Sequence, residues 1–291
     1  MPSRLTLMED GSLFLGTFLH PPWERAYFFS MKLDEIQEMA RDQFSKQSHR
    51  YGQGHILGNV EDVQMALAHI PLAPRSRVLD VATGAGHTGL YLASLDYDVT
   101  VADIAAPMLA RAREAAGKRG LTIKTNQHPA EELPYPAGFF DLVTCRVAAH
   151  HFSSPGAFVS ESARVLREGG YFLLIDGSAP DDEPEAEEWL HAVEKWRDPS
   201  HHRLLTPKEA ERLCEKSGLK VRHLSLSPFK MPDLEWYFDT AATTPENRRK
   251  VCDLVGSASP AVRQIFRITE EDGKTVWWWQ RLVLVAEKAG A

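Results

Sequence analysis

The stretch VLDVATGAGHTG, residues 78–89, joins an apolar strand to a glycine-rich loop and the start of a helix. Gly84, Gly86 and Gly89 satisfy the G-x-G-x-x-G pattern, in which a tight turn brings backbone N–H groups close to a ligand. Asp103 follows Gly84 by 19 positions, about where an acid that binds ribose hydroxyls belongs. The stretch therefore predicts a βα unit that binds a nucleoside-containing cofactor.

Asp80, at the end of the strand, distinguishes two cofactors that such a loop allows. A dinucleotide pyrophosphate binds at the positive N-terminus of a helix, and a carboxylate directly before the loop would repel it. S-adenosylmethionine instead carries an ammonium, a sulfonium and two ribose hydroxyls, for which Asp80 and Asp103 are suitable partners. We therefore expect S-adenosylmethionine as cofactor. An NAD-dependent oxidoreductase is the first alternative, and a non-catalytic S-adenosylmethionine-binding protein is the second.

Composition and charge limit the class of protein and its partners. Hydrophobic residues make up 43% and charged residues 25% of the 291 positions, as in globular proteins. A net charge of −7 without a lysine and arginine block predicts no nucleic-acid partner and no membrane insertion. The three cysteines are too widely spaced for a disulfide framework or a zinc knuckle, which favours a reducing compartment. We expect no metal, because a site built from the histidines would need convergent ligands that their spacing does not supply. We expect a cytoplasmic protein that acts on a small molecule.

Residues 1–30 are left out of the fold prediction because helical patterning begins only near Met31. The apolar stretch from Leu13 to Leu19 is short and follows two acids, so it is a poor secretory signal. We expect residues 1–30 to be a disordered arm, or an extension upstream of a natural start at Met31. Residues 31–291 are expected to form the main domain.

Strands and helices alternate from residue 77 onward, which is typical of repeated βα units. Seven strands are expected, at residues 77–82, 99–103, 121–127, 139–145, 171–176, 219–226 and 275–286. They predict an α/β fold with a Rossmann-like, seven-stranded, mostly parallel sheet and helices on both faces. Ligands then bind beyond the carboxyl ends of the strands. Inserts are expected at about 178–205 and 228–268, and the second forms a helical cap together with the helices near residues 31–70.

The order of these blocks resembles the class I S-adenosylmethionine-dependent methyltransferases, most closely the type 11 group related to ubiquinone and menaquinone biosynthesis methyltransferases. Besides the loop, the resemblance rests on the acid of VTVADI, on AEELPYPAGFFDLVTCRVAAHHF and on RVLREGGYFLLID, and it spans about residues 40–288. It implies methyl transfer to a small-molecule acceptor, with O-, C- and N-methylation all open. RVAAHHF and RDPSHHR further resemble a small bacterial subgroup without an established substrate.

Carried over by position, the resemblance implies cofactor contacts at Asp80, Gly84, Gly86, Asp103, Ile104, Ala130, Glu131 and Arg146. The residues themselves leave alternatives open. Asp103 would also serve as a helix N-cap, and Glu131 as a surface acid. Arg146 would form a structural ion pair as readily as it would grip the cofactor carboxylate. The family usually has glycine at Ala82 or Thr83, so the loop is expected to be narrower here.

Two adjacent histidines are the candidate catalytic residues. His150 and His151 follow the fourth strand, where methyl donor and acceptor should meet, and a histidine can accept a proton near neutral pH. The alternative is that one packs against the cofactor and the other caps a turn.

Three further histidines are candidates for the substrate pocket. His201 and His202 would bind an anionic or phenolic acceptor, or equally would anchor the insert that carries them. His55 would close over the cofactor from a glycine-rich segment. The tryptophans at 277–279 predict core packing first and a homodimer contact second.

Overall fold

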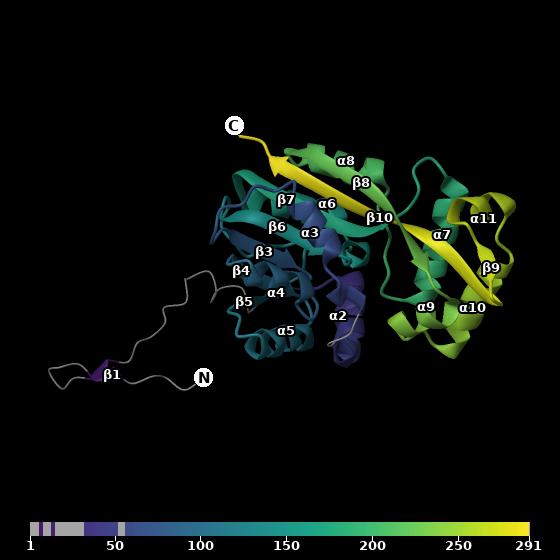
Figure 1. The fold of residues 1–291 in the computed structure, drawn as a ribbon, viewed down its shortest axis with the longest axis horizontal. Helices are drawn as coiled ribbons and strands as arrows, with labels where there is room; N and C mark the ends of the chain where they lie inside the picture. The colour runs from purple at the N-terminus through teal and green to yellow at the C-terminus, as the bar shows by residue number, and fades with distance from the viewer. Residues whose placement is uncertain (1–5, 8–12, 15–31, 52–55, 291) are drawn as a thin grey trace. The chain divides into compact units, whose positions relative to one another are not determined.

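The computed structural model describes residues 6–7, 13–14, 32–51 and 56–290 (Figure 1). The chain divides into two compact units, Met1–Lys32 and Leu33–Ala291. In the first, β1 (Thr6–Leu7) pairs antiparallel with β2 (Leu13–Phe14). Most of the arm expected over residues 1–30 lies outside the described residues.

The second unit is built on a mixed sheet with the strand order β5-β4-β3-β6-β7-β10-β8. The parallel strands are β3 (Arg77–Val81), β4 (Asp98–Asp103), β5 (Lys124–Gln127), β6 (Phe140–Arg146) and β7 (Leu166–Ser178). The antiparallel strands are β8 (Leu219–Met231), β10 (Lys274–Lys288) and the short β9 (Thr269–Glu271), which pairs with the start of β10. The predicted seven-stranded, mostly parallel α/β sheet is confirmed, with β9 as a small addition.

Helices cover the sheet because its central strands are apolar on both faces. The helices of the layers are α3 (Glu61–Leu67), α4 (His87–Ser94), α5 (Ala106–Lys118), α6 (Pro155–Val165) and α8 (Pro207–Lys216). The helix α2 (Glu35–Gln47) instead packs on α5 and on the turn at residues 149–151. Val63 of α3, Leu92 of α4 and Leu109 of α5 share one core with Val101 and Leu173 of the sheet. The 3-10 turns are η2 (Ser48–Arg50), η3 (Ile56–Gly58) and η4 (Ala149–His151). No helix in the described part of the chain is both long enough and apolar enough to cross a membrane.

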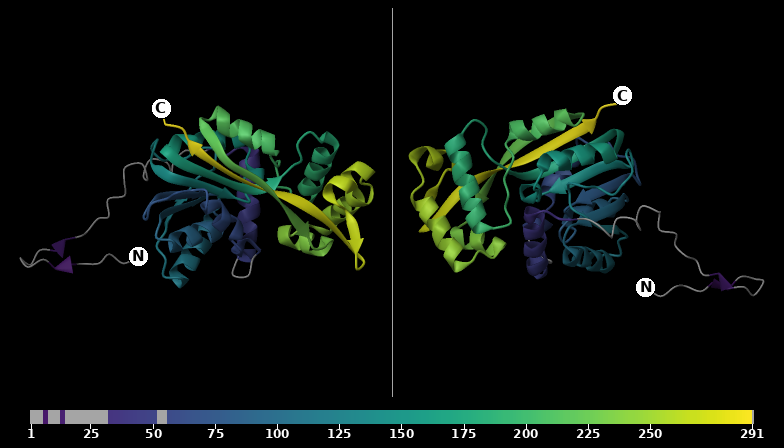
Figure 2. Two further views of the ribbon diagram at one scale, coloured as in Figure 1. Left: turned by 45° about the horizontal axis from the view of Figure 1, so that its top comes forward. Right: turned by 180° about the vertical axis from the view of Figure 1, so that it is seen from behind.

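A second core lies at one end of the sheet, where β8 and β10 project beyond the parallel strands (Figures 1 and 2). Four helices gather there: α7 (Pro184–Arg197), α9 (Leu234–Ala241), α10 (Pro245–Gly256) and α11 (Pro260–Phe266). Trp189, Tyr237 and Trp277 are buried at its centre. These helices form a cap that is held by the two long strands.

The strand β8 runs further than the sequence indicated. We expected it to end at Leu226 and a helical insert to begin at Pro228, but the strand continues to Met231 and the first helix begins at Leu234. β8 is an edge strand, where a residue without an N–H group is tolerated. Pro228 was therefore misread as a strand end.

The helix after the glycine loop packs very closely on the neighbouring strand at Gly89. A Cβ atom there would lie 2.4 Å from Val101 Cγ1 and 3.1 Å from Asp80 Oδ2. Ala82, one of the two positions where the resemblance implies a glycine, has a φ of +52°. The loop thus keeps the left-handed turn that glycine favours, although alanine is strained in it.

We predict that Gly89→Ala destabilises the protein by about 1–3 kcal/mol, because the added methyl group overpacks the contact between α4 and β4. Gly117→Ala is the matched control: it lies in α5 with no atom within 4 Å of its Cβ position, so it should stabilise by about 0.5–1 kcal/mol. Urea unfolding of both variants measures the difference. Equal stability of the two variants would contradict the close contact at Gly89.

Candidate active site

The glycine loop is shaped by the buried carboxylate of Asp80. Its Oδ2 accepts hydrogen bonds from Thr83 Oγ1 (2.5 Å) and Gly89 N (2.9 Å), and its Oδ1 accepts one from Thr144 Oγ1 on β6 (2.8 Å). Burial raises the pKa of Asp80, an effect that these hydrogen bonds only partly offset. The carboxylate therefore joins the loop, α4 and β6.

A cavity of about 470 Å³ opens beside this loop and extends past the ends of β4, β6 and β7 to the cap. Six of the eight expected cofactor residues line it: Gly84, Asp103, Ile104, Ala130, Glu131 and Arg146. Asp80 and Gly86 do not line it. The Asp80 oxygens are bonded to Thr83, Gly89 and Thr144, so the structure places them inside the loop. Gly86 instead provides the turn, with a φ of +89°.

Asp103 faces the cavity at the end of β4. Its Oδ2 accepts a hydrogen bond from Gly84 N and its Oδ1 accepts one from Ala105 N, each at 2.8 Å. Burial raises the pKa of Asp103 to about 6, although these two hydrogen bonds act in the opposite direction. Since each carboxylate oxygen can accept more than one hydrogen bond, Asp103 retains capacity for the hydroxyls of a ligand.

Glu131 and Arg146 both have protein partners. Glu131 Oε1 accepts from Ser153 N (2.9 Å), and Oε2 accepts from Gln37 Nε2 of α2 (2.9 Å). Arg146 Nε donates to both oxygens of Asp62 (2.9 and 3.0 Å), and its terminal nitrogens donate to the carbonyls of residues 57 and 59. Arg146 thus forms the structural ion pair that was one of its two expected roles.

His150 and Asp176 form a dyad at the ends of β6 and β7. His150 Nδ1 lies 2.7 Å from Asp176 Oδ1, and His150 N donates to Asp176 Oδ2 (3.0 Å). Burial lowers the pKa of His150, but the Asp176 carboxylate outweighs burial and the net pKa is raised. A carboxylate only accepts, so Nδ1 carries a proton, and in the neutral ring Nε2 has the free lone pair. No group in the described ranges bonds to Nε2, and the ring lines the cavity.

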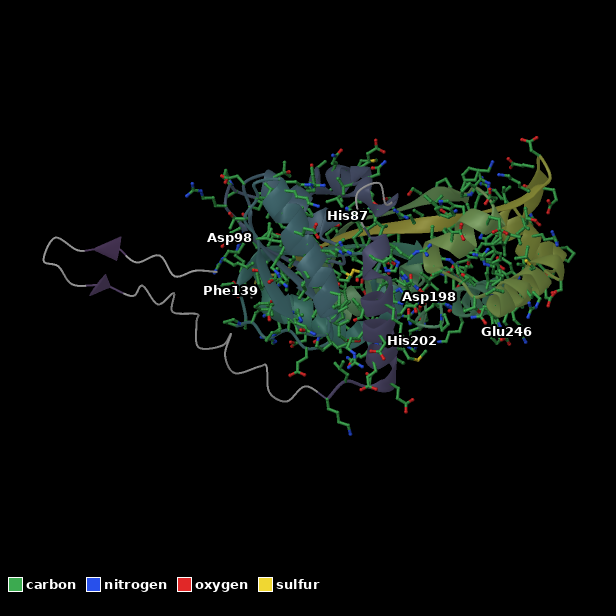
Figure 3. The ribbon with its side chains drawn as sticks, turned by 90° about the horizontal axis from the view of Figure 1, so that it is seen from below. His87, Asp98, Phe139, Asp198, His202 and Glu246 are labelled. Atoms are coloured by element: carbon green, nitrogen blue, oxygen red, sulfur yellow. The ribbon has the colours of Figure 1, made fainter. Side chains whose placement is uncertain are left out.

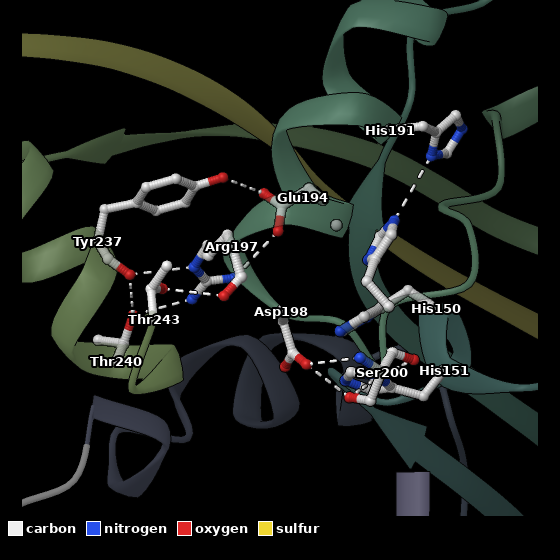
Figure 4. Close-up of polar contacts among 12 residues, drawn as sticks. His150, His151, His191, Glu194, Arg197, Asp198, Ser200, Tyr237, Thr240 and Thr243 are labelled. Atoms are coloured by element: carbon white, nitrogen blue, oxygen red, sulfur yellow. Dashed lines mark hydrogen bonds and ion pairs between the residues drawn. The ribbon is translucent and has the colours of Figure 1, made fainter. Parts of the chain in front are cut away.

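His151 has a different environment, although it is adjacent (Figure 4). Its Nδ1 lies 3.0 Å from the carbonyl oxygen of Ser200, and burial together with the charge of His150 lowers its pKa to about 4. Asp198 Oδ1 accepts from Ser200 N and Oγ (2.9 and 2.7 Å). Figure 3 shows Asp198 beside α2, from which Gln43 Nε2 donates to the same oxygen (3.4 Å). His151 is therefore a neutral ring near pH 7.

The remaining histidines differ in their access to the cavity. His201 is buried and lines the cavity, with its Nε2 3.5 Å from His191 Nδ1. His202 does not line the cavity, and its backbone N donates to the carbonyl of His150 (2.8 Å), as the anchoring alternative would require. His55 lies outside the described residues. Within the described ranges no group of three or more His, Cys, Asp or Glu side chains is arranged to hold a metal ion.

The far end of the cavity contains residues that the sequence reasoning did not identify. Glu194 of α7 accepts hydrogen bonds from Tyr237 Oη (2.8 Å) and Arg197 Nη1 (3.0 Å), and Arg197 also bonds to Thr240 Oγ1 (2.8 Å) (Figure 4). Phe229, Trp236, Trp279 and Arg281 complete this wall. Their spacing in the sequence does not connect them. Residues 277, 279 and 281 alternate along one predicted strand, however, and could have been placed on one face of it.

Several known proteins that resemble this chain in sequence and fold are methyltransferases. The profile of the family described as a methyltransferase domain matches residues 79–174. The uncharacterized methyltransferase YcgJ of Bacillus subtilis is 29% identical over 83% of this chain and 96% of its own, and its crystal structure superposes with a TM-score of 0.73 over 80% of this chain and 100% of YcgJ. A candidate methyltransferase from Bacillus halodurans is 32% identical, with a TM-score of 0.74 over 81% of this chain and 100% of that one.

A shorter match supports the same class. Demethylmenaquinone methyltransferase of Deinococcus radiodurans is 38% identical over 40% of this chain and 47% of its own length. With the fold and the cavity beside the glycine loop, these likenesses define the class. The chain belongs to the S-adenosylmethionine-dependent methyltransferase family. It is a methyltransferase whose methyl donor is S-adenosylmethionine, as predicted, and the NAD-dependent alternative receives no support.

We predict that His150 titrates above the ordinary value of 6.5 and His151 near 4 in ring-proton NMR spectra. Asp176→Asn should bring the pKa of His150 below 6.5, because burial then acts without the opposing carboxylate. A raised pKa in the folded state adds stability at low pH that is lost as the pH rises through it. The wild type should therefore lose more stability than Asp176→Asn between pH 6 and 8.

The matched control is Glu187→Gln, which removes an acid 3.5 Å from His191 Nε2 but leaves His150 in place. It should leave the titration of His150 unchanged. An equal pKa of His150 in the wild type and Asp176→Asn would contradict the dyad.

Proposed function

We propose that this methyltransferase methylates a hydroxyl group, or an acidic ring carbon, of a small molecule and that His150 removes the proton of the acceptor. The proposal rests on the dyad. Asp176 fixes a proton on Nδ1 of His150, and in the neutral ring Nε2 keeps a lone pair at the cavity. This is the arrangement of a general base, whose partner sets the tautomer and stabilises the charged ring.

The cofactor end of the cavity suits S-adenosylmethionine. Asp103 would accept hydrogen bonds from the ribose hydroxyls, while Ile104 and Ala130 would line the adenine and Gly84 would lie against the methionine part. Gly84 fits this role because no atom lies within 4 Å of its Cβ position, which leaves open space at the loop. The bound sulfonium supplies an electrophilic methyl carbon. The chain's residues have to align the acceptor, exclude water and take up a proton.

The two adjacent histidines are not equivalent as bases. His151, with a pKa of about 4, is a weak base that would hold little charge near pH 7. His150, with a raised pKa, takes up a proton more readily at that pH. We therefore assign the base to His150 and a wall position to His151.

The names of relatives do not select an acceptor. One is a demethylmenaquinone methyltransferase and another, from Cereibacter sphaeroides, is a phosphatidylethanolamine N-methyltransferase, which is 38% identical over 44% of this chain. The dyad favours an acceptor that must lose a proton, because a neutral amine can attack with its own lone pair. For this reason a hydroxyl or an acidic carbon is the preferred acceptor.

We predict that Asp103→Ala weakens S-adenosylmethionine binding by about 10-fold or more, the loss of one or two hydrogen bonds to a charged group. Asp98→Ala is the matched control, since Asp98 begins the same strand but forms an exposed ion pair with Lys124. Wild-type affinity should also fall as the pH drops below about 6, where Asp103 takes up a proton. This loss of affinity at low pH should be absent in Asp103→Ala.

Calorimetry from pH 5 to 8 measures both effects. Equal weakening by Asp98→Ala and Asp103→Ala would contradict the assigned ribose contact. Absence of binding by the wild type would overturn the cofactor.

We predict that His150→Gln lowers kcat by about 10²–10⁴-fold on any phenolic acceptor that the wild type methylates, the usual contribution of a general base. His151→Gln should lower it much less. The wild-type kcat should fall at acidic pH, where the base is protonated. His150→Gln should not show this fall. A screen of phenols and catechols with radiolabelled S-adenosylmethionine supplies the assay, and unchanged turnover of His150→Gln would remove the base from the mechanism.

A further inference from the structure

One wall of the cavity is formed by paired residues of β8 and β10. Trp279 is opposite Phe229 in the register, and Arg281 is opposite Ser227. Paired residues of antiparallel strands, and alternate residues along one strand, share a face of the sheet. The two rings lie at 12° to each other with centroids 5.8 Å apart. All four side chains line the cavity, so this wall combines a flat apolar surface with an adjacent guanidinium and hydroxyl.

Arg281 gives this wall a surplus positive charge. Its Nη1 donates to Asp62 Oδ2 (3.0 Å), but the same carboxylate also accepts two hydrogen bonds from Arg146. One carboxylate thus serves two guanidinium groups. In the part of the chain that the structure describes, Nε and Nη2 of Arg281 have no partner. They are donors in the planar geometry that binds a carboxylate through two hydrogen bonds.

Arg197, Glu194 and Asp198, which also line this end of the cavity, already have protein partners, and Glu61 accepts a hydrogen bond from Asn59 Nδ2 (3.3 Å). Arg197 donates to Glu194 Oε2 (3.0 Å), to Thr240 Oγ1 (2.8 Å) and to the carbonyl of Tyr237 (3.0 Å). Glu194 is occupied by that arginine and by Tyr237 Oη. Asp198 is bonded to Ser200. Among the described arginines that line the cavity, Arg146 and Arg197 use all their guanidinium nitrogens, whereas Arg281 has two without a partner.

A cationic acceptor does not suit this wall, because guanidinium groups already lie near its rings. Arg281 Cζ is 5.2 Å from the centroid of Phe229, and Arg197 Cζ is 5.9 Å from that of Trp279. Arg197 is neutralised by Glu194, so an ammonium group placed here would be repelled chiefly by Arg281, which shares one carboxylate with Arg146. A planar ring with a negative end would instead pack on the apolar surface and pair with Arg281.

The sheet order places this wall on the acceptor side of the site. The glycine loop follows β3, the dyad lies at the ends of β6 and β7, and Arg281 is on β10, three strands from β3. At about 4.8 Å per strand this is about 14 Å across the sheet. The cofactor residues, the base and the wall therefore follow one another in this order along the sheet.

We infer that Arg281 is a specificity-determining residue that binds a carboxylate on the acceptor, whose planar ring lies against Phe229 and Trp279 and whose hydroxyl faces His150. The acceptor class is then a hydroxylated aromatic acid. This inference rests on the proposed function, because the hydroxyl at His150 is the methylated group.

The test compares acids with their neutral amides on protein saturated with S-adenosylhomocysteine. The probes are 4-hydroxybenzoate and the longer 4-hydroxycinnamate, each against its carboxamide, measured by calorimetry on the wild type, Arg281→Gln and Arg281→Lys. Arg222→Gln is the matched control, since it removes the same charge from an exposed ion pair with Glu287 on the same two strands. S-adenosylhomocysteine affinity is measured for every variant.

For the wild type and for Arg222→Gln, we expect at least one acid to bind about 10-fold or more tightly than its carboxamide. A hydrogen-bonded charge pair contributes about this much affinity. Arg281→Gln should abolish this preference, Arg281→Lys should restore part of it, and neither should change S-adenosylhomocysteine affinity. The inference is overturned if acids and amides bind alike or not at all. It is also overturned if Arg281→Gln weakens S-adenosylhomocysteine binding, because the guanidinium would then hold the cofactor carboxylate. A wild type that fails to bind S-adenosylhomocysteine overturns the proposed function and this inference together.

Discussion

The geometry of the glycine loop depends on the hydrogen bonds of one buried carboxylate, that of Asp80. Burial of a carboxylate is costly unless donors surround it, and here they come from the loop (Thr83), from α4 (Gly89) and from the neighbouring strand β6 (Thr144). Satisfying this one group fixes where the loop turns and how closely α4 approaches β4. Gly84 is then presented to the Asp103 carboxylate, and the cofactor end of the cavity is formed.

A second buried carboxylate, Asp176, performs a comparable task on β7, two strands from β3 in the sheet. It holds both the backbone N and the ring Nδ1 of His150, so it fixes where the ring lies and which nitrogen carries the proton. Both acids lie at or near the carboxyl ends of parallel strands, where the fold brings ligand-binding groups together. The difference lies in what each one holds. Asp80 organises backbone and hydroxyl groups, whereas Asp176 adjusts the basicity of a side chain.

Sequence patterns predicted the parts of the protein that depend on local order. Strand and helix periodicity indicated the sheet, and Asp103 and His150 were found because each lies at or just after a strand end. The orientation of Asp80 was not predictable, since its donors arise from tertiary packing. The partners of Asp62 were missed for a related reason: Arg146 is 84 and Arg281 is 219 residues away. No residue spacing encodes contacts of that separation, and Pro228 concealed the strand that carries half of the aromatic wall.

The strand β10 links the stability of the cap to recognition of the acceptor. Trp277, Trp279 and Arg281 share one face of it: the first is buried in the cap core, and the other two line the cavity. Trp277 and the wall residues thus lie on one continuous strand, whose register is held by hydrogen bonds to β8. The cofactor end rests on separate contacts around Asp80. This arrangement would let the proposed acceptor wall differ with the cap while the contacts around Asp80 stay the same.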